Sequence, residues 1–342
     1  MIQVLLTAIG AFFLVLGPAR SATCTGNDIR LKVCLLEPAY NKESKLGDDY
    51  RSPTCQSGVT PDQRTHVENA FNIAPDKIKD ELCRLKKIFI ADRSFGLWEN
   101  PASPSFMGTG KASYVAIDGN VISHSPSSPK PTALPEVEDS LIQSVLLKFD
   151  PTSAPSTWTG HSATVSSGTD TTPLAVLSQL THELGHIKWY RDNIDSSLAC
   201  FDTDFIDRSW HRGTLRNFYD RRWTALSEDP GADHRPGKPT RHPRDIQGKA
   251  DAVHLRNLYN QGFASALAAV TPDEDFVETF KLVVLRNAKS TTATNPLLNS
   301  LTLEIKPNGS PLTVDVLNNS MQELADKASC VRPLVCLSPS TC

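Results

Sequence analysis

The residues with the clearest chemical potential are His182, Glu183 and His186, which form the motif H-E-x-x-H. Residues four apart in an α-helix lie one above the other on the same face. Two imidazoles placed in this way can bind one metal ion, with zinc–nitrogen distances of roughly 2.0–2.1 Å. The carboxylate after the first histidine then lies beside the metal, where it can take a proton from metal-bound water. The spacing therefore predicts a site that binds Zn2+ and activates water for hydrolysis.

A helix must position this motif, and the sequence around it predicts one. Thr172-Pro173 is typical of a helix start. Apolar side chains then recur at helical spacing, at Leu174, Leu177, Leu180, Leu184 and Ile187. We expect a helix from residue 172 to about 190 that packs its apolar face on the core and turns its histidines toward a cleft. A chance H-E-x-x-H occurs roughly once per hundred chains of this composition, so this helical setting strengthens the metal interpretation.

Over residues 172–190 the chain resembles the zincin superfamily of metallopeptidases. The resemblance implies an α+β, zincin-like fold, in which the helix carrying H-E-x-x-H lies behind a twisted, largely parallel sheet. It also implies zinc as cofactor, a peptide or protein as substrate, and hydrolysis of the peptide bond by water. Glu183 would act as general base and then as acid to the leaving amine.

A catalytic zinc needs a third protein ligand and a fourth position for water. The letters E-D-F-V-E at residues 274–278 resemble the E-x-F-x-E segment on the second metal-binding helix of gluzincins, including the lethal-factor-like peptidases. In that group the first Glu binds zinc, and an acidic residue four positions later supports a metal-bound His. These roles correspond to Glu274 and Glu278. Because Thr271-x-x-Glu274 also fits a capping box, Glu278 is an alternative ligand.

Two other patterns offer different third ligands. The run H-E-x-x-H-x-x-W-x-x-D looks like the metzincin pattern with Asp192 in place of the third His. Trp189, however, stands where that pattern needs a Gly for a sharp turn. Gly213-Thr214 with Asp220 resembles the aspzincins, but at a different offset. We therefore predict Glu274 as the ligand and keep Glu278 and Asp192 as alternatives.

Side chains that could donate a hydrogen bond to the transition state are more numerous. Tyr219 and Tyr259 are candidate oxyanion donors. The same role is open to four histidines in or near a basic stretch of the chain, namely His211, His234, His242 and His254.

The N-terminus and the cysteines indicate export. Residues 4–16 are almost entirely apolar, yet too few to span a bilayer comfortably. The small residues of Ala19-Arg20-Ser21-Ala22 suit cleavage, so residues 1–22 are predicted to be a signal peptide. The eight cysteines include no C-x-x-C pair, which argues against a zinc ribbon and for up to four disulfides. We expect a secreted, extracellular, disulfide-stabilised protein.

Residues 23–342 are expected to form one zincin-like domain. It would comprise a Cys-rich, loop-dominated lead-in (23–60), a basic Pro-rich insertion (207–249) and a Cys-rich tail (329–342). An apolar content of 39% suits a globular core, and a net charge of -3 gives no reason to expect nucleic acid or an anionic membrane as partner. We expect a monomer with no nucleic-acid or membrane partner.

Local patterns predict the other elements. Helices are expected at about 61–72, 75–85, 271–287 and 312–328. Strands are expected at 87–91, 113–117, 121–122 and 301–305, and surface loops at 123–136 and 151–172.

Two other functional classes remain open at this point. One is a secreted, disulfide-rich binding or effector protein whose metal site is structural or vestigial. The other is a zinc hydrolase that acts on a non-peptide amide, because the motif specifies the water chemistry and not the substrate.

Overall fold

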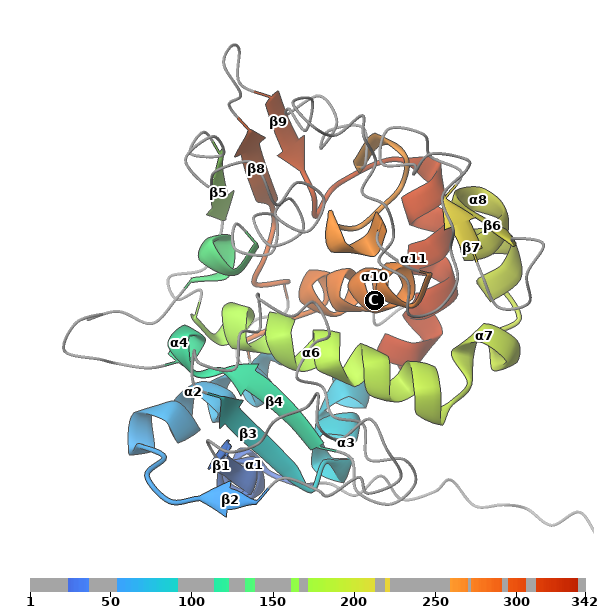
Figure 1. Cartoon of the computed structure of the whole chain (residues 1–342). Helices are drawn as coiled ribbons and strands as arrows, with labels where there is room; N and C mark the ends of the chain where they lie inside the picture. Colours follow the sequence, from blue (N-terminus) through green and yellow to red (C-terminus); the bar gives the residue numbers. More distant parts are fainter. Residues whose placement is uncertain are drawn as a thin grey trace, which may run out of the picture.

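The structure of the chain is a computed structural model, which describes residues 24–36, 54–91, 114–122, 133–138, 161–165, 172–212, 219–221, 259–269, 272–290, 295–305 and 312–337. The predicted signal peptide and residues 222–249 of the predicted insertion lie outside these ranges. One long helix, α6 (Thr172–Arg191), crosses the middle of the molecule. The N-terminal elements lie on one side of it and the C-terminal helices on the other (Figure 1).

The N-terminal side is built on a four-stranded sheet in the order β2-β1-β3-β4. Three strands are parallel and β2 is antiparallel at the edge. The strands are β1 (Val33–Leu36), β2 (Cys55–Gln56), β3 (Lys87–Ala91) and β4 (Tyr114–Asp118). Ile88 and Ile90 face the main core, whereas Phe89 and Tyr114 belong to a second apolar cluster on the other face. Burial on both faces explains why β1, β3 and β4 are almost continuously apolar.

Three helices complete this side, namely α1 (Gly26–Lys32), α2 (Pro61–Ile73) and α3 (Asp76–Arg84). The start of α2 is fixed by a capping box, in which Thr60 and Gln63 satisfy each other's backbone N–H groups. Pro61 occupies the first turn, where its missing N–H carries no cost. Helix α2 packs against α6, so the N-terminal side supports the long helix directly.

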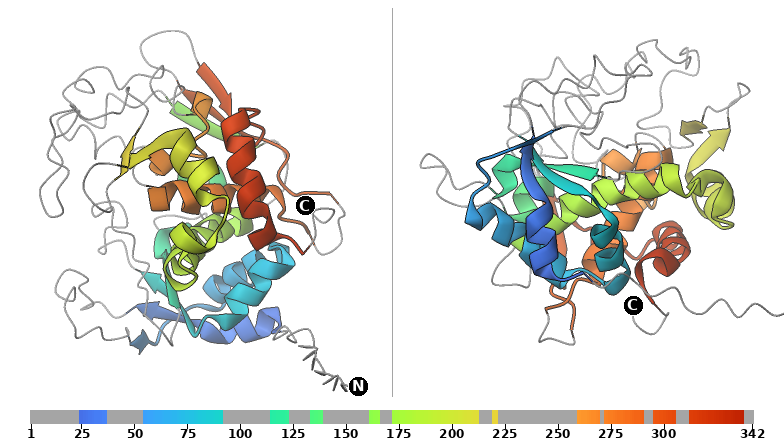
Figure 2. Two further views of the ribbon diagram at one scale, coloured as in Figure 1. Left: turned by 90° about the vertical axis from the view of Figure 1, so that its right-hand side faces the viewer. Right: turned by 90° about the horizontal axis from the view of Figure 1, so that it is seen from below.

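The C-terminal side contains α10 (Pro272–Arg286), α11 (Gln322–Val335) and an antiparallel sheet in the order β5-β8-β9. Its strands are β5 (His161–Val165), β8 (Leu301–Ile305) and β9 (Leu312–Asp315). Figure 2 shows α10 beside α6 in both further views. The remaining short elements are α4 (Gly119–Ile122), α7 (Ile194–Ser197), η4 (Asp202–Ile206), α8 (Asp207–Ser209), β6 (Trp210–Arg212), β7 (Tyr219–Arg221) and η5 (Leu267–Ala269).

Elements with a strong local pattern are confirmed within a few residues. These are the helices predicted near 61–72, 75–85, 172–190 and 271–287, and the strands predicted at 87–91, 113–117 and 301–305. The chain is thus a mixture of helices and strands. None of the described helices combines the length and the apolar character that a membrane span requires.

Elements that depend on distant partners were predicted wrongly. The helix expected at 312–328 is strand β9 followed by α11, because residues 312–315 pair with β8. The loop expected at 151–172 contains β5, which pairs with the other edge of β8. The strand predicted at 121–122 belongs to helix α4, and residues 134–136 of the predicted loop belong to a helical segment, 134–138. The lead-in contains α1, β1 and β2, and the start of the predicted insertion contains α8, β6 and β7.

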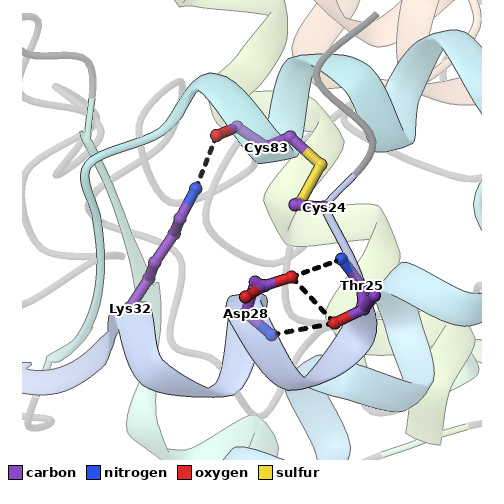
Figure 3. Close-up of a disulfide and its surroundings, with 5 residues drawn as sticks. All are labelled: Cys24, Thr25, Asp28, Lys32 and Cys83. Carbon is purple, nitrogen blue, oxygen red and sulfur yellow. Dashed lines mark hydrogen bonds between the residues drawn. A yellow bond between two sulfur atoms is a disulfide. The ribbon is translucent and has the colours of Figure 1, made fainter.

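The expected disulfides are present in the described residues. Cys24 pairs with Cys83, Cys34 with Cys55 and Cys200 with Cys330. Cys336 is also disulfide-bonded. Figure 3 shows the first bridge tying the start of α1 to α3, next to the capping box of Thr25 and Asp28. The third bridge joins the segment after α6 to α11.

The bridges lead to a prediction on stability. The Cys200–Cys330 bridge closes 130 residues and the Cys34–Cys55 bridge closes 21. Replacing either pair by serine should lower the free energy of unfolding by about 2–5 kcal/mol, and the longer loop should cost roughly 1.5 kcal/mol more, because it restricts the unfolded chain more strongly. Urea unfolding of both double variants measures this difference, and a larger loss for the short loop would contradict the prediction.

Candidate metal centre

Helices α6 and α10 pack face to face, and this contact builds the site. The apolar stripe predicted for α6 is buried, with Leu180 and Leu184 in the core. On its α10-facing side lies Gly185, within the motif itself. A Cβ atom at this position would lie 3.1 Å from Cγ1 and 3.2 Å from Cα of Val277. Because Gly185 has no side chain, α10 can approach α6 closely here, and neighbouring residues on the two helices come within reach of each other.

His182 and His186 of α6 and Glu274 of α10 converge on one point. The two Nε2 atoms of the histidines lie 3.3 Å apart. The carboxylate of Glu274 lies 3.8 Å from Nε2 of His182 and 3.6 Å from Nε2 of His186. One ligand atom from each of the three residues lies within 4.8 Å of the others. Glu274 was the predicted third ligand, and it follows His186 by 88 positions in the sequence. The fold places it beside the two histidines.

These distances fit a tetrahedral metal site. Ligand atoms bonded at roughly 2.0–2.1 Å in tetrahedral geometry are separated by about 3.3–3.4 Å. The Nε2–Nε2 separation of 3.3 Å matches this value, and the distances from Nε2 of His186 to Oε1 of Glu274 (3.6 Å) and from Nε2 of His182 to Oε2 of Glu274 (3.8 Å) are slightly longer. Two imidazoles with one carboxylate form a donor set that is typical of catalytic zinc. The residues present therefore fit Zn2+.

Glu278 lies on the other nitrogen of the first histidine. Its Oε1 atom is 2.7 Å from Nδ1 of His182, and its side chain is fully buried. A proton on Nδ1 that is donated to this carboxylate leaves the Nε2 lone pair directed at the other two ligands. In this geometry Glu278 contacts Nδ1 of His182 and Glu274 lies on the side of Nε2, which is the arrangement that the predicted order of the two acidic residues requires.

Burial and neighbouring charges shift the pKa values of two side chains in the site, His182 and Glu274. Burial lowers the pKa of His182, but the hydrogen bond to Glu278 and the charge of Glu274 outweigh it and raise the pKa to about 9. Burial raises the pKa of Glu274 to about 8, although the charge of His182 opposes this shift. Because each side chain affects the other, the His182–Glu274 pair holds a proton near neutral pH when no metal is present. A metal ion must displace this proton, so its affinity should fall as the pH falls.

Asp192, the metzincin-like alternative, is engaged elsewhere. Its carboxylate accepts hydrogen bonds from Arg191 at 2.7 Å and from Lys188 at 3.1 Å. These bonds, with the charges they bring, lower its pKa. The second His/Cys/Asp/Glu group among the described residues is Cys200, Asp204 and Cys330, and its two cysteines form a disulfide. The centre on α6 and α10 is therefore the stronger candidate.

Glu183, the predicted base, is buried on α6 at 5% exposure. Its negative charge is one of those that raise the pKa of His182, so it lies close to the metal ligands. Tyr259, in contrast, is almost completely buried, and burial together with the charges of Glu138 and Glu278 raises its pKa.

Three residues near the site were missed from the sequence. Lys281 forms buried ion pairs with both Glu278 and Glu138. Tyr190 is half-exposed, and the charges of Asp273 and Glu274 add to the effect of burial on its pKa, which is raised. Its spacing of four residues after His186 is a signal that could have identified it.

The remaining candidates lie on other elements or outside the described residues. His211 lies in β6, and Tyr219 and Asp220 lie in β7, the strand that pairs with it. Gly213-Thr214, His234, His242 and His254 lie outside the described residues.

Comparisons of the chain with protein-family models, with curated proteins and with solved structures gave no match. Interpretation of the site therefore depends on its own geometry and chemistry.

The arrangement predicts how three variants differ in zinc content. Glu274→Ala should lose zinc or bind it far more weakly, because one ligand is removed. Glu278→Ala should lower the affinity by roughly 10–100-fold, because it removes a group that orients a ligand. Asp192→Ala should keep its zinc. Zinc analysis of the three purified proteins measures the order, and metal loss confined to Asp192→Ala would contradict the assignment.

Proposed function

We propose that this protein is a secreted zinc metalloendopeptidase of the zincin type, similar to gluzincins. The observation that carries the proposal is the convergence of His182, His186 and Glu274 with Glu183 close beside them. Catalytic zinc sites have three protein ligands and keep a position open, whereas structural sites are closed by four. The cluster in the described residues offers three.

Glu183 favours a catalytic metal site over a structural one. A structural metal site does not need an additional buried carboxylate that is not a ligand. Here such a carboxylate lies close enough to His182 for its charge to raise the pKa of the ring. A general base must lie within reach of the water it activates. The position of Glu183, one residue after a ligand on the same helix, is suited to this role.

The chemistry then divides between the metal and the side chains. Bound zinc would polarise the substrate carbonyl and lower the pKa of water. His182, His186 and Glu274 hold the ion, and Glu278 holds the Nδ1 proton of His182. Glu183 accepts the proton of the attacking water and delivers it to the nitrogen of the leaving amine. The C–N bond breaks, and the products are a carboxylic acid and an amine.

Export of the protein is part of the proposal. Disulfides form and persist in oxidising compartments and are rare in the cytosol. The described residues contain three bridges, and every cysteine among them is paired. This pairing supports an extracellular location, and action on peptides or proteins as a monomer belongs to the same proposal.

The proposed role of Glu183 predicts a specific loss of turnover. Glu183→Gln should keep the fold and the bound zinc, because Glu183 is not a ligand. Turnover of a peptide substrate should fall by roughly 10²–10⁴-fold, the usual scale for general acid–base catalysis. Incubation of the secreted protein with a peptide library, with and without a chelator, identifies a substrate on which to measure this loss.

Asp192→Asn provides the matched control for this experiment. It also removes a carboxylate charge from α6, but its ion pairs with Lys188 and Arg191 lie outside the metal group. Its turnover should stay within a few-fold of the parent protein. Near-normal activity in zinc-loaded Glu183→Gln would overturn the mechanism, and activity that survives complete removal of zinc would overturn the metallopeptidase assignment.

A further inference from the structure

A buried lysine lies directly behind the proposed metal ligands. Lys281 follows Glu278 by one turn of α10, and its side chain is 7% exposed. Its Nζ atom donates to Oε2 of Glu278 at 2.7 Å and to Oε1 of Glu138 at 3.3 Å. One ammonium group thus joins two buried carboxylates, one from its own helix and one from residues 133–138.

The contacts continue from this lysine to the metal ligand. Oε2 of Glu278 accepts from Lys281, while Oε1 of the same carboxylate is bonded to Nδ1 of His182. Each oxygen of Glu278 therefore has its own partner, and the plane of the carboxylate is fixed from both ends. The sequence of contacts Glu138, Lys281, Glu278, His182 connects three separate segments of the chain.

Stability alone is a weak reason for a lysine at this position. Taking an ammonium group and two carboxylates out of water costs several kcal/mol per ion, and well-packed apolar side chains of similar volume often replace such groups without loss. What an apolar side chain cannot do is hold Oε2 of Glu278. Left without a donor in the interior, this oxygen would turn the carboxylate toward another partner, at the expense of the bond to His182.

We propose that Lys281 is a positioning residue for the metal site, acting on His182 through Glu278. It holds the carboxylate in the orientation in which Oε1 accepts the Nδ1 proton, so that Nε2 faces the ion. Glu138 holds the ammonium group in turn from a segment distant in sequence. This inference rests on the proposed function and extends it one contact beyond the group that touches the ligand.

The test compares zinc affinity with stability in matched variants. Lys281→Met removes the charge and keeps a side chain of similar length. Lys327→Met is the control, because Lys327 is also buried and bonded to a buried carboxylate, Asp275, at 2.7 Å. Zinc affinity is measured by competition with a chromophoric chelator, and the free energy of unfolding is measured on metal-free protein.

If Lys281 is a positioning residue, its loss should affect zinc affinity more than the loss of Lys327 does. Lys281→Met should weaken zinc binding by roughly 10–100-fold, the usual effect of losing a group that orients a ligand. Lys327→Met should lower stability but change zinc affinity less than about 3-fold. Lys281→Arg, which keeps a donor for Glu278, should recover most of the affinity.

The possible outcomes distinguish failure of the positioning role of Lys281 from failure of the proposed function. Unchanged zinc affinity in folded Lys281→Met, or equal losses in the two Met variants, overturns the positioning role and leaves the proposed function intact. Failure of the parent protein to bind zinc overturns the proposed function and this inference with it. If Lys281→Met does not fold, Glu138→Gln decides, because it loosens the hold on Lys281 and should weaken zinc binding several-fold. Unchanged affinity in Glu138→Gln would then count against the role.

Discussion

The close packing of α6 against α10 is the constraint on which the rest of the structure depends. Gly185 and Val277 meet where the helices are nearest, and the ligand atoms of His182, His186 and Glu274 lie within 4.8 Å of one another as a result. Helix α2 and strand β4 support α6 from the N-terminal side, and α11 packs against α10 from the C-terminal side. The surrounding elements therefore serve mainly to hold two helices at one separation.

Buried charges reinforce this helix pair at three places. Lys281 joins Glu278 to Glu138, Lys327 joins α11 to Asp275 of α10, and Lys188 of α6 is paired with Glu81 of α3. Buried ion pairs contribute little net stability when compared with apolar packing, but breaking one of them is costly. Among these three, the pairs of Lys281 lie next to a proposed ligand, whereas the pairs of Lys327 and Lys188 join α10 and α6 to neighbouring helices. The bridge from Cys200 to Cys330 likewise ties the segment after α6 to α11.

Motifs within one short segment could be predicted from the sequence, whereas contacts between distant segments could not. The helix with H-E-x-x-H follows from its own apolar spacing, and the order of Glu274 and Glu278 follows from a resemblance in a short segment; the structure brings both to the histidines. Strand β9 was mistaken for a helix because its pairing with β8 is not encoded in its own residues. Lys281 and Glu138 were missed for a similar reason, since 143 positions separate them and only the fold joins their charges.

X-ray absorption spectroscopy of the zinc-loaded protein tests the central claim most directly, because it reports the atoms bound to the ion. The account predicts four light ligand atoms at about 2.0–2.1 Å, with the multiple-scattering pattern of two imidazoles and the remaining positions filled by carboxylate and water oxygens. Sulfur at about 2.3 Å, a single imidazole, or zinc that fails to bind at all would contradict a metal centre built by His182, His186 and Glu274.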